Sequence, residues 1–207
     1  KSIKKEFSEK NNNLFKSFFP NSNYNFKFNE INKFRKFKTV IVLGMGGSIL
    51  GTKAIYSFLK YKIKKNFIFI DNLDQEKLIK TKKNYNLKNV LFLIISKSGN
   101  TTETIVNTGF FKPFLKKSNT IIIAEDKNNL LANFAKEKSF KLVKHSSKIG
   151  GRYSVFSDVG MLPSYLMGLN PINFKKNIPK LFNNNVFLKE SIKQIKKIKL
   201  KKFKTLI

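Results

Sequence analysis

Short apolar runs alternate with amphipathic stretches from residue 39 onward. Five runs, at residues 39–43, 66–70, 90–95, 120–124 and 140–143, are almost continuously apolar. Runs of this kind are typical of strands buried on both faces of a parallel sheet. Between them, residues 49–60, 74–84, 101–116 and 128–138 carry apolar side chains three and four positions apart, which predicts helices. The pattern predicts an α/β fold: a doubly wound, five-stranded parallel sheet in three α/β/α layers.

The same pattern divides the chain into three segments. Residues 1–38 combine helix and loop and should wrap the domain, and residues 39–170 contain the sheet and a closing helix over 157–168, where Pro163 predicts a kink. Residues 171–207 are rich in lysine, with apolar residues at helical spacing, and we expect the start of a second, truncated lobe. This last stripe could also rest on a membrane surface. Packing against a missing part of the protein is the more common use of such a stripe.

Charge is the most prominent feature of the composition, with a formal net charge of +30. Only Arg35 and Arg152 among the 42 basic residues are arginines, and the lysines are spread along the whole chain. Proteins that read phosphates or base edges favour arginine, so we interpret the charge as a compositional bias that attracts anionic substrates and not as a nucleic-acid site. We therefore expect no nucleic-acid partner.

Cysteine is absent and His145 is the single histidine, which excludes disulfides, thiolate metal sites and any metal site built on histidines. His145 itself we interpret as a surface or turn histidine. No apolar run approaches the roughly 20 residues of a membrane-spanning helix. We expect a cytoplasmic protein with no membrane partner.

The first loop that could carry chemistry follows the first strand. Residues 44–51 read Gly-Met-Gly-Gly-Ser-Ile-Leu-Gly. Glycines permit a sharp turn and let a ligand approach the backbone, and the following helix offers unpaired N–H groups to an anion. A dinucleotide-binding turn is an alternative, since Asp71 ends the second strand where a ribose-binding acid is expected. Ile49 occupies the position of that motif's third glycine, which argues against it.

The second loop follows the third strand and reads Ser-Lys-Ser-Gly-Asn-Thr-Thr-Glu-Thr over residues 96–104. Five hydroxyls, a lysine and a helix N-terminus suit a phosphate dianion. The pattern is not that of a nucleoside-triphosphate loop. Ordinary helix capping, with Asn100 as N-cap and Glu103 completing a capping box, is the alternative for part of this sequence.

The third candidate is Gly150-Gly151-Arg152-Tyr153-Ser154. A lone arginine after two glycines, in a chain that otherwise uses lysine, indicates a position where a planar, permanently charged group is needed.

Together these three strings resemble a known family. Gly46-Gly47-Ser48 and residues 96–104 are similar to the sugar isomerase (SIS) domain, which binds phosphorylated sugars on a flavodoxin-like sheet. Residues 150–154 resemble a signature of the glucose-6-phosphate isomerase family, and the similarity runs from about residue 40 to about residue 170. Asp158 departs from the family pattern, which usually has a small residue there.

The resemblance implies an aldose–ketose isomerase of glycolysis and gluconeogenesis that interconverts glucose 6-phosphate and fructose 6-phosphate without metal or organic cofactor. It further implies that Arg152 stabilises the enediolate, Gly47 and Ser48 line the sugar, and the phosphate contacts come from Ser96, Lys97, Ser98 and Thr101, with Thr104 in support. Family members are commonly dimers, so we expect a homodimer for the intact protein.

The family's glutamate base, histidine and second lysine lie beyond the matching portion. We therefore expect a chain that binds substrate but barely turns it over. The chain begins with Lys1 and not with Met, and residues 195–207 read as a helix without a stop signal, so we expect truncation at both ends. A sugar-phosphate-sensing module, a nucleic-acid-binding protein, a dinucleotide oxidoreductase and dual glucose/mannose specificity remain alternatives.

Overall fold

The computed structural model describes residues 13–20 and 22–200. Its central feature is a five-stranded, all-parallel sheet in the order β2-β1-β3-β4-β5. The strands are β1 (Thr39–Gly44), β2 (Asn66–Ile70), β3 (Val90–Ile95), β4 (Thr120–Ala124) and β5 (Lys141–Lys144). The predicted fold class is confirmed, and each strand lies within one residue of the predicted bounds at either end.

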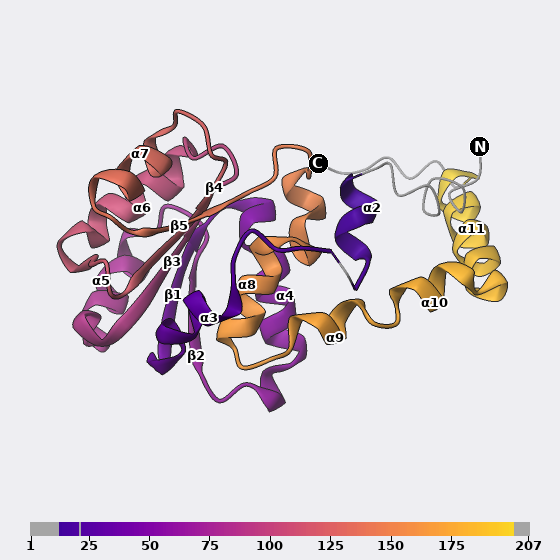
Figure 1. The fold of residues 1–207 in the computed structure, drawn as a ribbon, viewed down its shortest axis with the longest axis horizontal. Helices are drawn as coiled ribbons and strands as arrows, with labels where there is room; N and C mark the ends of the chain where they lie inside the picture. Colours follow the sequence, from indigo (N-terminus) through magenta and orange to yellow (C-terminus); the bar gives the residue numbers. More distant parts are fainter. Residues whose placement is uncertain (1–12, 21, 201–207) are drawn as a thin grey trace. The chain divides into compact units, whose positions relative to one another are not determined.

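Helices cover both faces of this sheet. Figure 1 shows α5 (Gln75–Asn84), α6 (Thr102–Phe111) and α7 (Leu130–Glu137) on one side, and α4 (Leu50–Phe58) and α8 (Asp158–Leu166) on the other. Every residue of β3 and β4 is buried, as expected for strands covered from both sides. The core cluster joins these strands to the helices, as where the ring of Phe92 in β3 contacts that of Phe111 in α6.

Short 3₁₀ segments account for the main differences from the expected helices. The stretch predicted as 49–60 divides into α4 and η3 (Lys60–Lys62), and the one predicted as 101–116 divides into α6 and η5 (Lys112–Phe114), where Pro113 occupies the first turn of η5. Two more such segments lead into strands, η1 (Lys33–Lys36) before β1 and η4 (Leu87–Asn89) before β3. Pro163 lies inside α8, as the sequence predicts.

By its contacts the chain forms two compact units, residues 23–171 and the two terminal segments together. The first unit contains the sheet and also α3 (Phe28–Asn32). The described part of the second comprises α2 (Asn13–Phe18), α10 (Ile178–Asn183), α11 (Asn185–Leu200) and all but the first residue of α9 (Pro171–Lys175). Within it Lys175 Nζ donates to Ser22 Oγ at 2.6 Å. The predicted boundaries at residues 38/39 and 170/171 stay predictions. None of the helices in the described ranges is long and apolar enough to cross a bilayer.

The strand order fixes where a ligand could bind. The connection through α4 leads from β1 to the edge strand β2, and the connection through α5 returns across β1 to β3. Strand order thus reverses between β1 and β3, and ligands of open parallel sheets bind beyond the carboxyl ends of the strands at such a point. The first two predicted loops follow these two strands.

Candidate functional site

The glycine loop after β1 packs directly against the arginine segment. Its residues 46–48 form η2 (Gly46–Ser48), and the arginine segment forms η6 (Gly151–Phe156). A Cβ on Gly47 would lie only 2.3 Å from the carbonyl carbon of Gly151 and 2.7 Å from the amide nitrogen of Arg152. Two backbones can approach this closely only where a side chain is absent. The structure therefore joins the first and third motifs, which lie about 100 residues apart in the sequence.

Further contacts hold η6 in place. Ser154 Oγ lies 2.6 Å from Gly151 O and 3.3 Å from Gly47 O, so its hydroxyl bridges the two segments. The Cα of Gly160 in α8 lies against the carbonyl of Val155, leaving no room for a Cβ there. These contacts fix the backbone on both sides of Arg152.

Arg152 itself is exposed. Among the residues that the structure describes, no group forms a hydrogen bond or ion pair with its guanidinium. A guanidinium carries five N–H donors in a planar fork and suits planar or polyoxygen anions. Arg152 is therefore available to an anionic ligand beside the glycine loop.

The loop at residues 96–101, which we call the Ser-Thr loop, has an internal network of hydroxyls. Ser96 Oγ is buried, lies 2.8 Å from Thr101 Oγ1 and accepts the N–H of Gly99 at 3.2 Å. Ser98 is exposed, and its Oγ lies 3.4 Å from Thr101 Oγ1. The loop thus presents Ser98 outward and uses Ser96 largely to hold its own shape.

The N-terminus of α6 differs from the capping alternative. Its N-cap is Thr101, whose side chain makes no capping hydrogen bond, and Asn100 Oδ1 instead accepts the N–H of Leu130 at 2.9 Å. The interpretation of Asn100 and Glu103 as a capping box is therefore wrong. Helix N-termini carry unpaired N–H groups and a partial positive charge, which favour an anion.

Lys97 reaches across the carboxyl edge of the sheet. Its Nζ donates to Ser147 O at 2.9 Å, in the segment after β5, and lies 3.8 Å from Glu125 Oε1. Lys127 also pairs with Glu125, at 2.8 Å, and its hydrogen bond holds the pKa of that carboxyl below its ordinary range. The ammonium of Lys97 thus has partners within the chain, unlike the guanidinium of Arg152.

The remaining predicted site residues differ in exposure. Gly47 and Ser48 are partly exposed, and Gly47 lies against the backbone of Arg152. Thr104 lies one turn into α6, is 1% exposed, and its Oγ1 finds no hydrogen-bond partner among the described residues. Thr104 therefore does not line an open surface, and its support of the Ser-Thr loop stays a prediction.

His145 is buried, at 5% exposure, so its interpretation as a surface histidine is wrong. Its Nδ1 lies 2.7 Å from Ser146 O, while Nε2 is buried without a hydrogen-bond partner in the described ranges. Burial lowers the pKa of this imidazole below its ordinary value of 6.5. Burial therefore favours the neutral form of this side chain over the charged form.

Asp158, which departs from the family pattern, is accommodated at the start of α8. Its two carboxylate oxygens accept the backbone N–H and the side-chain Nδ2 of Asn25 at 2.7 and 2.8 Å. Burial raises the pKa of this carboxyl, while the hydrogen bonds from Asn25 oppose the rise. The sequence gives no indication of this pairing across 133 positions.

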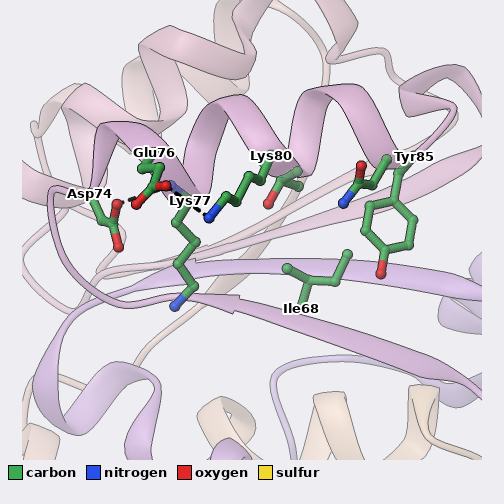
Figure 2. A pocket seen from close by; sticks show the side chains of 8 residues that line it. Ile68, Asp74, Glu76, Lys77, Lys80 and Tyr85 are labelled. Carbon is green, nitrogen blue, oxygen red and sulfur yellow. Dashed lines mark hydrogen bonds and ion pairs between the residues drawn. The ribbon is translucent and has the colours of Figure 1, made fainter.

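Asp71 and a surface pocket along α5 lie outside the three motifs. Asp71 lies between Lys53 Nζ at 2.6 Å and Lys77 Nζ at 3.3 Å, so the acid expected to bind a ribose is paired with lysines. A pocket along α5, shown in Figure 2, is lined in part by the exposed Glu76–Lys80 ion pair, and none of its lining residues belongs to the three motifs. No cluster of three metal-ligating side chains occurs among the described residues.

Comparisons with known proteins identify the family of this chain. The phosphoglucose isomerase family matches residues 28–178. The glucose-6-phosphate isomerase of Methanocaldococcus jannaschii is 37% identical over 137 residues, which cover 65% of this chain and 34% of that protein. That of Borreliella afzelii is 39% identical over 140 residues, which cover 62% of this chain and 26% of that protein. The chain thus spans about a third or less of these relatives' lengths.

Solved structures share the fold. A hypothetical protein from Thermus thermophilus superposes with a TM-score of 0.73 at 21% identity, covering 87% of this chain and 46% of the other. A glucose-6-phosphate isomerase from Chlamydia trachomatis superposes with a TM-score of 0.60 at 25% identity, covering 71% of this chain and 29% of that one. The matched residues contain all three motifs and the whole sheet, and the chain belongs to the phosphoglucose isomerase family.

Proposed function

We propose that this chain is the sugar-phosphate-binding part of a cytoplasmic enzyme of glycolysis and gluconeogenesis that interconverts glucose 6-phosphate and fructose 6-phosphate. The observation that carries the proposal is the close approach of Gly47 to Gly151, which places an unpaired Arg152 beside the glycine loop. The Ser-Thr loop follows β3, the strand next to β1, so a phosphate and a sugar ring could occupy one crevice.

Each motif has a separate role in this proposal. Lys97, Ser98 and Thr101 contact the phosphate together with the uncapped N-terminus of α6, which attracts an anion. Ser96 holds the phosphate through the shape of the loop, because its buried hydroxyl is bonded to Thr101 and Gly99. The glycine loop at Gly47 and Ser48 lines the sugar. Binding of the phosphate draws Lys97 away from Ser147 O, because an ammonium gains more from a dianion than from a neutral carbonyl.

Arg152 acts on the reacting atoms. Moving a proton between C2 and C1 of the open-chain sugar creates an enediolate, and a guanidinium already fixed beside it stabilises that charge without reorganisation. The proton transfer itself needs a general base. We propose that the base, together with the family's histidine and second lysine, comes from parts of the enzyme outside this chain, and that the intact enzyme is a homodimer that needs no cofactor.

Calorimetric titration with fructose 6-phosphate tests the proposal. Arg152→Ala should weaken binding by about 10-fold or more, since a charge-assisted hydrogen bond contributes roughly 1.5–3 kcal/mol. The matched control is Arg35→Ala, which removes the chain's other arginine, whose guanidinium lies 4.7 Å from the ring of Tyr165. Equal losses in both variants would mean that overall charge attracts the ligand, and would contradict the proposed site.

Two further measurements separate the alternatives. A mannose 6-phosphate titration reports dual specificity, and a sensing module would bind sugar phosphates without isomerase activity even when the full-length protein is assayed. Steep salt dependence of DNA binding would instead favour a nucleic-acid partner.

A further inference from the structure

The segment from the end of β4 to the first turn of α7 is hydrogen-bonded to the Ser-Thr loop at three points. The N–H of Glu125 donates to Lys97 O at 3.0 Å, and the N–H of Leu131 donates to Gly99 O at 3.1 Å. Leu130 adds a third bond, from its N–H to Asn100 Oδ1 at 2.9 Å. The backbone of the Ser-Thr loop is therefore shaped partly by residues some 30 positions further along the chain.

Asn129 is the centre of this segment and is 5% exposed. Its Nδ2 donates to Glu125 O at 2.9 Å and to Lys127 O at 3.2 Å. Its Oδ1 accepts the N–H of Ala132 at 2.9 Å, which makes Asn129 the N-cap of α7. With both amide donors and the carbonyl oxygen bonded, the side chain has one orientation.

The amide of Asn129 also lies directly against Gly99. Gly99 has a φ of +70°, and a Cβ built on it would lie 1.8 Å from Asn129 Oδ1 and 2.2 Å from Cγ. The turn of the Ser-Thr loop therefore rests on the flat face of this amide. The N–H of Gly99 points back to Ser96, at 3.2 Å from both its carbonyl oxygen and its Oγ.

We propose that Asn129 is a positioning residue for the Ser-Thr loop, holding Gly99 so that Ser98, Thr101 and the N-terminus of α6 stay arranged for a phosphate. The inference deepens the proposed function and rests on it for the identity of the ligand. It does not make Asn129 a ligand, because the side chain is buried and its polar atoms are already bonded.

Neither aspartate nor serine reproduces all the contacts of the Asn129 side chain. Aspartate would keep the cap of α7 but lose the donors to Glu125 O and Lys127 O, and would add a negative charge beside the anion. Serine would keep the cap, since both residues are good N-caps, and would lose the contact with Gly99. Capping and positioning can therefore be separated by substitution.

The experiment uses the full chain and compares Asn129→Ser with Asp74→Ala. Asp74 caps α5 by accepting the N–H of Lys77 at 2.9 Å, the same geometry as Asn129 to Ala132, away from the Ser-Thr loop. We expect Asn129→Ser to weaken fructose 6-phosphate binding by about 10-fold or more and to accelerate amide hydrogen exchange at residues 97–101. Asp74→Ala should lower the denaturation midpoint but leave both quantities unchanged.

Hydrogen exchange and binding affinity together separate a failure of the positioning role from a failure of the proposed function. Unchanged exchange at residues 97–101 in Asn129→Ser, or affinity within twofold of the parent, would overturn the positioning role. Accelerated exchange together with no sugar-phosphate binding by the folded parent would support the positioning role and contradict the proposed function of the chain.

Discussion

Gly47→Ala is the sharpest perturbation that the structure offers, because the added methyl meets only backbone. The new Cβ would lie 2.3 Å from Gly151 C and 2.4 Å from Gly151 O, whereas ordinary contacts begin at 3.4 Å. The glycine loop and η6 must therefore separate by roughly 1 Å, and backbone atoms in a packed domain cannot swing aside as a flexible side chain can. Overpacking of this kind costs about 1–3 kcal/mol.

The functional effect should exceed the effect on stability. A domain has about 5–15 kcal/mol of stability, so most of the chain should stay folded. Displacement of catalytic groups by 1 Å can cost about 100-fold in rate, and we expect fructose 6-phosphate binding to weaken by about 10-fold or more as Arg152 moves away.

Calorimetry on the chain and urea unfolding measure the two effects separately. Gly109→Ala is the control, because Gly109 is an exposed residue of α6 whose Cβ would meet no atom within 4 Å. That change should leave binding unaltered and add about 0.5–1 kcal/mol of stability. Unchanged affinity in Gly47→Ala would refute the argument that the contact between the two glycines positions Arg152.

Two further predictions concern the groups around Lys97. Glu125→Gln should strengthen fructose 6-phosphate binding by about 2–5-fold by calorimetry, because it removes a carboxylate that competes with the phosphate for Lys97, whereas Glu76→Gln, in an exposed pair elsewhere, should not. The pKa of His145 is lowered on folding, so below 6.5 the unfolded chain binds more protons than the folded one. The free energy of unfolding should be fully retained above pH 6.5 and should decrease as the pH falls from 6.5 toward the folded pKa. His145→Asn should flatten that decrease in urea unfolding at about pH 7.5 and about pH 5.5, and an unchanged slope would assign the dependence to other groups.

Strands were the easiest elements to predict from the sequence. The central strands β3 and β4 are runs of apolar residues covered on both faces, so burial alone marks their bounds. The edge strands β2 and β5 are partly exposed, yet their apolar residues are still bounded by polar ones. Helix ends were harder, because tertiary contacts decide them. Asn100 has the residue type of a cap, yet its side chain bonds to Leu130 and leaves Thr101 as the N-cap.

In the candidate site, too, the sequence predicts some features and not others. Loop position follows from topology, so the sequence predicts that the Ser-Thr loop and the glycine loop share one edge of the sheet. The contact of Gly47 with Gly151 and the support of Gly99 by Asn129 depend on the path of the chain between them. Asn129 carries no ligand-binding signal of its own, since an asparagine at the start of a helix is an ordinary cap.

Glycines in these motifs serve packing as much as ligand access. Gly47 makes room for the backbone of Gly151, and Gly99 makes room for the side chain of Asn129, so in both places a missing Cβ lets one loop fix another. Arg152 and Lys97 supply the positive charge, and these two contacts fix the positions of the loops that carry it. It follows that glycine substitutions should lower affinity with the charges retained, while Arg152→Ala should lower affinity with the packing retained, and comparing the two separates placement from electrostatics.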